Sequence, residues 1–247
     1  MPEKRPSRKH GCAIAMGLVV LAILLSNVLG SRDPRVPLDF STLPPAKTTQ
    51  PDTVGIFFCV DVSGSMTGEI GGARKIDISR RAMNLVFDQI DAFTHAHPEK
   101  KVKVGLCAFE AQPRIVLPLN LFDPNAARKA AASLRPGGNT GIGRAIVLAL
   151  TELMKSGDET KAILVMTDGE NNRGRGPEEI VRAIKQNNNT RKMPTGDVEV
   201  SLIAFDVKSS TFDGVKEAGA KVMESRDEAS LQRIMTTIVE EVLLEAQ

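Results

Sequence analysis

Hydrophobic and polar positions follow two alternating patterns from residue 52 to the end of the chain. Mainly apolar runs of strand length recur at residues 54–60, 102–109, 114–119, 162–167, 198–205 and 220–223. The segments between them carry apolar residues three or four positions apart, which is the spacing of an amphipathic helix. We therefore expect helices over residues 75–96, 124–134 and 142–153, after Pro177, and from Ser225 onward.

Strands that alternate with helices predict an α/β fold with a mainly parallel sheet. The strand runs contain few polar residues, as expected when helices cover both faces of the sheet. Pro118 interrupts the run 114–119, and proline within a strand favours an edge position. The predicted fold is a doubly wound, six-stranded sheet with helices on both faces and one short antiparallel edge strand.

Two predicted helices carry clear start signals. Pro177 is followed by Glu178 and Glu179, and the first turn of a helix favours both proline and acidic residues. Ser225 is followed three residues later by Glu228, which is the spacing of a capping box. We therefore expect Ser225 to cap the last helix.

The first 51 residues differ in composition from the rest. Residues 1–10 are basic and residues 12–30 are uncharged and mostly apolar, so residues 1–30 are either a cleaved signal peptide or a signal-anchor helix. Either reading exports the remaining chain: it is membrane-anchored through residues 12–30, its one expected membrane contact, or secreted or periplasmic after cleavage. Residues 31–51 contain five prolines and predict an extended linker, which leaves residues 52–247 as the domain.

Charge and aromatic content narrow the class of partner. The chain has a net charge of +2, and its first thirty residues contribute four basic side chains against one acidic side chain. The rest is close to neutral, and the chain contains no Trp or Tyr. A nucleic-acid partner is not expected, because a basic surface and aromatic stacking platforms are both missing from the composition.

Oxygen-bearing side chains gather where predicted elements end. The first buried strand runs into Asp61, Ser63 and Ser65, and glycine-rich turns carry Thr140 and Asp168. Ligands of open parallel sheets collect at the carboxyl ends of the strands. Carboxylate and hydroxyl oxygens suit a hard cation such as Mg²⁺.

These five positions resemble the metal-ion-dependent adhesion site of von Willebrand factor A-type domains. In that family a D-x-S-x-S loop, here Asp61, Ser63 and Ser65, is completed by a later Thr and Asp, here Thr140 and Asp168. The resemblance covers residues 52–246 and implies a vWA/Rossmann-like fold. It also implies a bound Mg²⁺, with Mn²⁺ or Ca²⁺ as alternatives, and a partner protein that presents Glu or Asp to the metal.

Other readings of the same residues remain open. The domain could be a structural subunit in which the metal only orders loops. A strand that ends in an aspartate is also found in phosphoryl-transfer enzymes that use D-x-D, but Ser63 replaces the second carboxylate, so we expect no enzyme. The sequence does not decide whether Cys59 and Cys107 are free or bridged.

Overall fold

The computed structural model describes residues 50–189 and 197–245. These residues lie within one compact unit, residues 44–247. The predicted signal or anchor segment, residues 1–30, and all but the last two residues of the predicted linker lie outside the described residues. Within the described part of the chain, no helix combines the length and the apolar character needed to cross a membrane.

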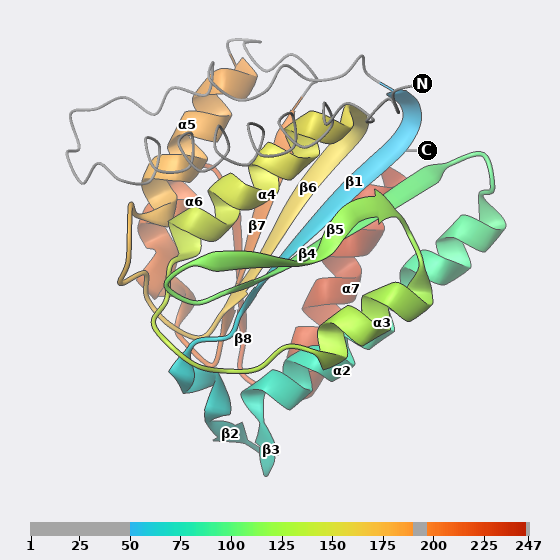
Figure 1. Cartoon of the computed structure of the whole chain (residues 1–247). Coiled ribbons are helices and arrows are strands. Elements are labelled where there is room, and N and C mark those ends of the chain that lie inside the picture. Colours follow the sequence, from blue (N-terminus) through green and yellow to red (C-terminus); the bar gives the residue numbers. More distant parts are fainter. Residues whose placement is uncertain (1–49, 190–196, 246–247) are drawn as a thin grey trace, which may run out of the picture. The chain divides into compact units, whose positions relative to one another are not determined.

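A six-stranded sheet forms the centre of the domain (Figure 1), in the order β5-β4-β1-β6-β7-β8. All neighbouring strands are parallel except β4 and β5, which are antiparallel. The predicted sheet is thus confirmed, including its antiparallel edge strand. The strands are β1 (Gln50–Asp61), β4 (Lys101–Phe109), β5 (Pro113–Leu121), β6 (Asp158–Thr167), β7 (Val198–Phe205) and β8 (Lys221–Ser225).

Helices cover both faces of this sheet, as the sequence predicts. In Figure 1, α2, α3 and α7 lie on one face, and α4, α5 and α6 lie on the other. The helices are α2 (Lys75–Ala96), α3 (Pro124–Ala132), α4 (Ile142–Ser156), α5 (Pro177–Asn189), α6 (Asp213–Glu217) and α7 (Glu228–Leu244). Short elements complete the domain: η2 (Gly64–Thr67), η3 (Ser209–Phe212) and a small hairpin of β2 (Glu69–Ile70) and β3 (Ala73–Arg74).

β1 lies at the centre of the sheet because it is apolar on both faces. Every residue from Thr53 to Asp61 is buried. Phe57 lies in register with Gly105 of β4, and a Cβ atom at residue 105 would lie 2.5 Å from the Phe57 ring. Glycine at residue 105 therefore makes room for the aromatic ring between two central strands.

The two cysteines of the described residues are neighbours on these strands. Cys59 of β1 is in register with Cys107 of β4, and both are buried and free. Burial raises the pKa of the Cys59 thiol well above its ordinary value. Both cysteines are fully buried in the core, where a free cysteine packs as a small apolar side chain.

Several element boundaries differ from the sequence prediction. Ser225 does not cap α7; it is the last residue of β8, and its pairing with Phe205 keeps it extended. Asp227 is the cap, because its side chain accepts a hydrogen bond from the Ser230 backbone and Ser230 bonds back. β1 begins at Gln50, earlier than the predicted strand at residues 54–60, because the Gln50 amide donates to the Gly157 carbonyl.

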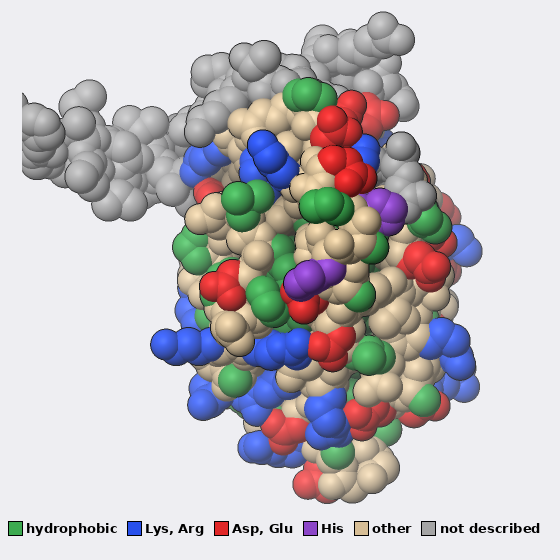
Figure 2. All heavy atoms as spheres, turned by 90° about the vertical axis from the view of Figure 1, so that its right-hand side faces the viewer, with side chains coloured by type: hydrophobic (Ala, Val, Ile, Leu, Met, Phe, Trp, Pro, Cys, Tyr) green, Lys and Arg blue, Asp and Glu red, His purple; other side chains and the backbone are tan. Residues whose placement is uncertain are grey.

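Basic and acidic side chains are mixed on the face shown in Figure 2, and hydrophobic side chains lie on it in separate spots. The large apolar side chains exposed in the described residues are Leu85, Ile115, Leu121 and Leu244. Two of these, Ile115 and Leu121, lie on the edge strand β5, where one side of the strand has no neighbour in the sheet.

Candidate metal centre

The candidate site lies where the carboxyl ends of β1 and β6 meet. β4 pairs with one edge of β1, and the chain later returns to place β6 along the other edge of β1. Such a reversal of strand order leaves a crevice at the carboxyl edge, which is where open α/β sheets bind ligands. Asp61 is the last residue of β1, and Asp168 directly follows β6.

Asp61 is a fully buried carboxylate. One oxygen, Oδ1, accepts a hydrogen bond from the Ser63 amide at 2.7 Å, and the other, Oδ2, accepts one from the Thr167 hydroxyl at 2.6 Å. Burial raises the pKa of Asp61 to about 6, although these hydrogen bonds and others from Ser63 oppose the shift. The negative charge of Asp61 is therefore under-compensated, and a nearby cation would stabilise it.

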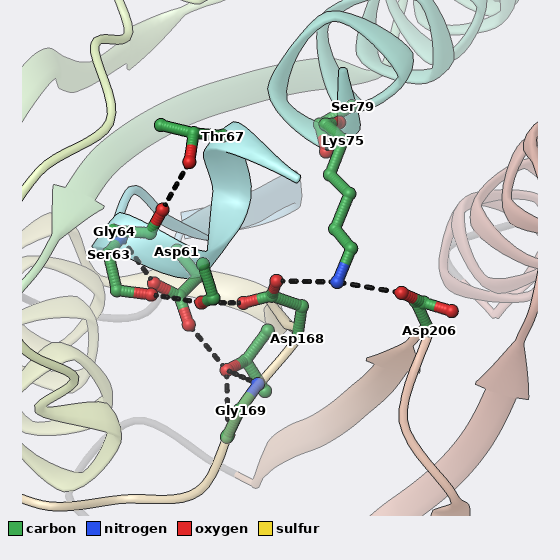
Figure 3. A network of polar contacts seen from close by, with 11 residues as sticks. Asp61, Ser63, Gly64, Thr67, Lys75, Ser79, Asp168, Gly169 and Asp206 are labelled. Atoms are coloured by element: carbon green, nitrogen blue, oxygen red, sulfur yellow. Dashed lines mark hydrogen bonds and ion pairs between the residues drawn. The ribbon is translucent and has the colours of Figure 1, made fainter. Parts of the chain in front are cut away.

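Two serine hydroxyls connect the first loop to Asp168 (Figure 3). The Ser63 and Ser65 Oγ atoms lie 3.0 Å apart, and Ser65 Oγ donates to Asp168 Oδ1 at 2.6 Å. Ser63 is buried and Ser65 is exposed, so this cluster of oxygens reaches the protein surface. A ligand from outside can therefore approach it.

Thr140 lies on the loop that precedes α4. Hydrogen bonds join this loop to the loop after β6 and to the loop after β1. The Thr140 amide donates to Asn172 Oδ1 at 3.0 Å, and its carbonyl accepts from the amides of Asn172 and Arg173. In turn, the Gly64 amide donates to the Gly138 carbonyl at 3.1 Å. Within the described residues, however, the hydrogen bonds at Thr140 use its backbone, and its hydroxyl is not joined to the other four side chains.

The structure thus brings four of the five predicted residues into one hydrogen-bonded chain, Asp61, Ser63, Ser65 and Asp168. Thr140, the fifth, is on the adjacent loop. Thr140 is 4 % exposed and is therefore buried, like Asp61 and Ser63.

Sequence reasoning missed two charged residues of the site, Lys75 and Asp206. The Lys75 ammonium lies 2.9 Å from Asp168 Oδ2 and 2.7 Å from Asp206 Oδ2 (Figure 3). Burial lowers the pKa of Lys75, but its hydrogen bonds to Asp206 and Asp168 outweigh that effect and raise the pKa overall. One signal was present in the sequence: a lysine as the first residue of a helix is electrostatically unfavourable, because the helix dipole is positive there.

Thr167 is a further residue of the cluster that the predicted ligand set omitted. Besides its bond to Asp61, its Oγ1 lies 3.1 Å from the Gly169 carbonyl. It therefore orients Asp61 from the neighbouring strand. Its position immediately before Asp168 was the available signal.

The donors of this cluster fit a hard divalent cation. Two carboxylates and several hydroxyls are all oxygen ligands, which Mg²⁺ prefers. Among residues 50–189 and 197–245, no three or more His, Cys, Asp or Glu side chains form a group that could hold a metal. A metal at this site must therefore combine the two carboxylates with hydroxyls and water.

A cavity of about 400 Å³ adjoins the loop that carries Asp168. Glu170 and Asn171 line it from this loop, Glu178 from the start of α5, and Phe212 and Val215 from η3 and α6. The cavity is thus partly acidic and partly apolar, and it lies next to the candidate site along the chain.

Comparisons with known proteins identify the architecture. Residues 56–170 match the family model for the von Willebrand factor type A domain. No curated protein matches the sequence. The matched segment includes all five predicted site residues, the second half of β1 and the strands β4, β5 and β6.

Three solved structures illustrate the likeness in fold. The conserved hypothetical protein BatB from Bacteroides thetaiotaomicron is 18% identical, with a TM-score of 0.60, over 76% of this chain and 97% of that one. The PilB minor pilin from Streptococcus sanguinis is 16% identical, with a TM-score of 0.63, over 83% of this chain but only 64% of that one. The vWF domain of the type V pili tip protein Mfa5 from Porphyromonas gingivalis is 10% identical, with a TM-score of 0.63, over 81% and 98%. The six-stranded sheet, its flanking helices and the matched segment together show that this protein contains a domain with the von Willebrand factor type A fold.

Proposed function

We propose that this protein is a divalent-cation-dependent binding module for another protein, with a role in adhesion or assembly. The observation that carries the proposal is the hydrogen-bonded chain from Asp61 through Ser63 and Ser65 to Asp168, at the carboxyl edge of the sheet. The fold supports it, because two structures with this fold are described as a minor pilin and as a pilus tip protein.

The proposed metal is Mg²⁺, with Mn²⁺ or Ca²⁺ as alternatives, held by Asp61, Ser63, Ser65, Thr140 and Asp168. When bound, the ion would supply positive charge and coordination positions that a carboxylate can fill. Mg²⁺ in proteins usually retains several waters, which an incoming ligand can displace. The proposed partner therefore presents a Glu or Asp side chain.

Each residue of the candidate metal site has a defined role in this proposal. Asp61 and Asp168 provide the negative charge that attracts the ion, and the hydroxyls of Ser63, Ser65 and Thr140 provide neutral oxygens. Thr167 holds Asp61 in place through its 2.6 Å hydrogen bond. We propose a binding site and not a catalytic one, because Ser63 stands where a second carboxylate would be needed for phosphoryl transfer.

The proposed location is outside the cytoplasm. Residues 12–30 would anchor the protein in a membrane or be removed during export. The neighbouring structures described as pilus proteins support this proposal. Cell fractionation followed by N-terminal sequencing of the mature protein separates anchoring from cleavage.

The experiment that tests the proposal is a pull-down from membranes in Mg²⁺, with elution by EDTA. The variants Asp61→Ala and Asp168→Ala should lose the EDTA-eluted partner while their circular dichroism spectra remain those of the wild type. Their Mg²⁺ affinity should fall by more than about 100-fold, since loss of an outer-shell partner alone commonly costs 10- to 100-fold. Asp88→Ala is the matched control, because Asp88 is an exposed acid on α2 paired with Arg128.

Two results would contradict the proposal. Partner binding that is equal in Mg²⁺ and in EDTA would indicate a structural subunit that docks without the metal. Hydrolysis of a generic phosphate ester that is lost in Asp61→Ala would indicate an enzyme.

A further inference from the structure

Lys75 pairs with Asp168 and also with Asp206, which adds two charges that a simple set of metal ligands does not require. The Lys75 side chain is 12% exposed and the Asp168 side chain is fully buried, so their ion pair is largely shielded from water. The Asp206 side chain is 43% exposed. Lys75 therefore bridges a buried carboxylate and one that faces solvent.

The local structure does not favour a positive charge at residue 75. Lys75 is the first residue of α2, where the helix dipole opposes a positive charge. Asp206 has φ of +57°, in the left-handed region, which aspartate adopts more readily than most residues other than glycine. The Asp206 amide donates to the Ser225 carbonyl at 2.7 Å, which holds this turn at the end of β7. Tertiary contacts thus place Lys75 beside Asp168 and Asp206 beside Lys75.

Asp168 has both of its carboxylate oxygens occupied by these contacts. Oδ1 accepts from Ser65 and Oδ2 accepts from Lys75. A divalent cation that uses Asp168 must compete with the Lys75 ammonium for the same charge. The second bond of Lys75 offers it another partner, since the Asp206 carboxylate is already 2.7 Å away.

We propose that Lys75 is an internal counter-ion of the candidate metal site, which a divalent cation displaces from Asp168 toward Asp206. This inference rests on the proposed function of the site. Lys75 acts here as a positioning residue: it neutralises Asp168 before the ion arrives and lowers the affinity for the ion by electrostatic repulsion. Asp206 acts in the opposite sense, because it draws the positive charge of Lys75 away from Asp168.

The proposal predicts opposite effects for two substitutions. Lys75→Met removes the competing charge, so Mg²⁺ should bind about tenfold more tightly, as expected for a like charge removed at close range in a partly buried site. Asp206→Asn leaves Lys75 with Asp168 as its only charged partner in the triad, so Mg²⁺ should bind about threefold more weakly. A purely structural role for the triad would weaken binding in both variants.

The experiment is calorimetric titration of the full chain with Mg²⁺ alone, for the wild type and both variants. Lys103→Met is the matched control. Lys103 is 14% exposed and forms a 2.5 Å ion pair with the fully buried Asp158, at the opposite end of the strands. The Lys103→Met substitution should therefore leave the affinity for Mg²⁺ unchanged. Circular dichroism and urea unfolding confirm that each variant is folded.

The outcomes separate this inference from the proposed function. The counter-ion role is supported if the wild type binds Mg²⁺, Asp61→Ala does not, the Mg²⁺ affinity of Lys75→Met is higher than that of the wild type, and the Mg²⁺ affinity of Asp206→Asn is lower. Equal or weaker binding by folded Lys75→Met, or unchanged binding by Asp206→Asn, overturns the counter-ion role and leaves the metal site standing. No Mg²⁺ binding by the wild type overturns both. If Lys75→Met does not fold, the result for Asp206→Asn decides.

Discussion

The substitution Asp61→Asn should abolish metal binding. In the absence of metal, it should make the folded protein more stable than the wild type. Asp61 is fully buried, and burial raises its pKa from 3.8 to about 6. Its charge at neutral pH therefore opposes folding unless a cation compensates it. The asparagine side chain has nearly the same shape and no charge.

The expected gain follows from the shift in pKa. A rise of about two pKa units corresponds to about 3 kcal/mol of unfolding free energy at neutral pH. The amide oxygen of asparagine can still accept from the Ser63 amide, but the bond from Thr167 to Oδ2 is lost. That loss costs about 1 kcal/mol, and Thr167 can donate instead to the Gly169 carbonyl, 3.1 Å away. The net gain should be about 2 kcal/mol in EDTA at pH 7.5.

The pH dependence has a definite sign. The folded wild type binds the Asp61 proton more tightly than the unfolded chain does, so its stability falls as pH rises from 3.8 through about 6. The charge-related part of the difference between variant and wild type should be largest above pH 6. It should decrease to about half at pH 5.

Urea unfolding in EDTA at pH 7.5 and pH 5 measures both effects. Titration with Mg²⁺ should then stabilise the wild type alone, by about 2.7 kcal/mol when the free ion is at 100 times its dissociation constant. The reasoning is refuted if Asp61→Asn is less stable than the wild type in EDTA at pH 7.5. It is also refuted if the difference does not change with pH.

Three further substitutions test other parts of the account. Thr140→Ala should weaken partner binding more than Mg²⁺ binding, and calorimetry that finds equal losses would contradict a role for its hydroxyl in engaging the partner. Lys161, whose pKa burial lowers to about 8, should make the wild type about 2 kcal/mol more stable at pH 9.5 than at pH 7.5. The reason is that the folded chain holds the Lys161 proton less tightly than the unfolded chain does. In urea unfolding, Lys161→Met should not show this rise in stability with pH. Gly105→Ala would place a Cβ 2.5 Å from the Phe57 ring and should cost about 1–3 kcal/mol, so an unchanged urea midpoint would argue against tight packing there.

The sequence carried most of the information about the elements. Buried strands such as β1 are continuous apolar runs, and α2 has a regular apolar stripe, so both were predicted with nearly correct limits. The hairpin of β2 and β3 and the five-residue α6 were not predicted, because two to five residues are too few to show a period. The cap of α7 was misplaced by two residues, because Ser225 pairs with Phe205 in the sheet before the helix begins.

The residues of the candidate site also divide into those that the sequence indicated and those that only the structure revealed. Asp61, Ser63 and Ser65 are close in sequence, and a resemblance to a known motif pointed to Thr140 and Asp168. No local pattern pairs Lys75 with Asp168, 93 residues away, or with Asp206 beyond it. The sequence alone determined which oxygen-bearing side chains stand at the ends of predicted elements, where we propose an ion site, since residue type and position are local properties. Only the tertiary structure decided which charges surround them, because the packing of α2 and the turn after β7 brings together side chains that are distant along the chain.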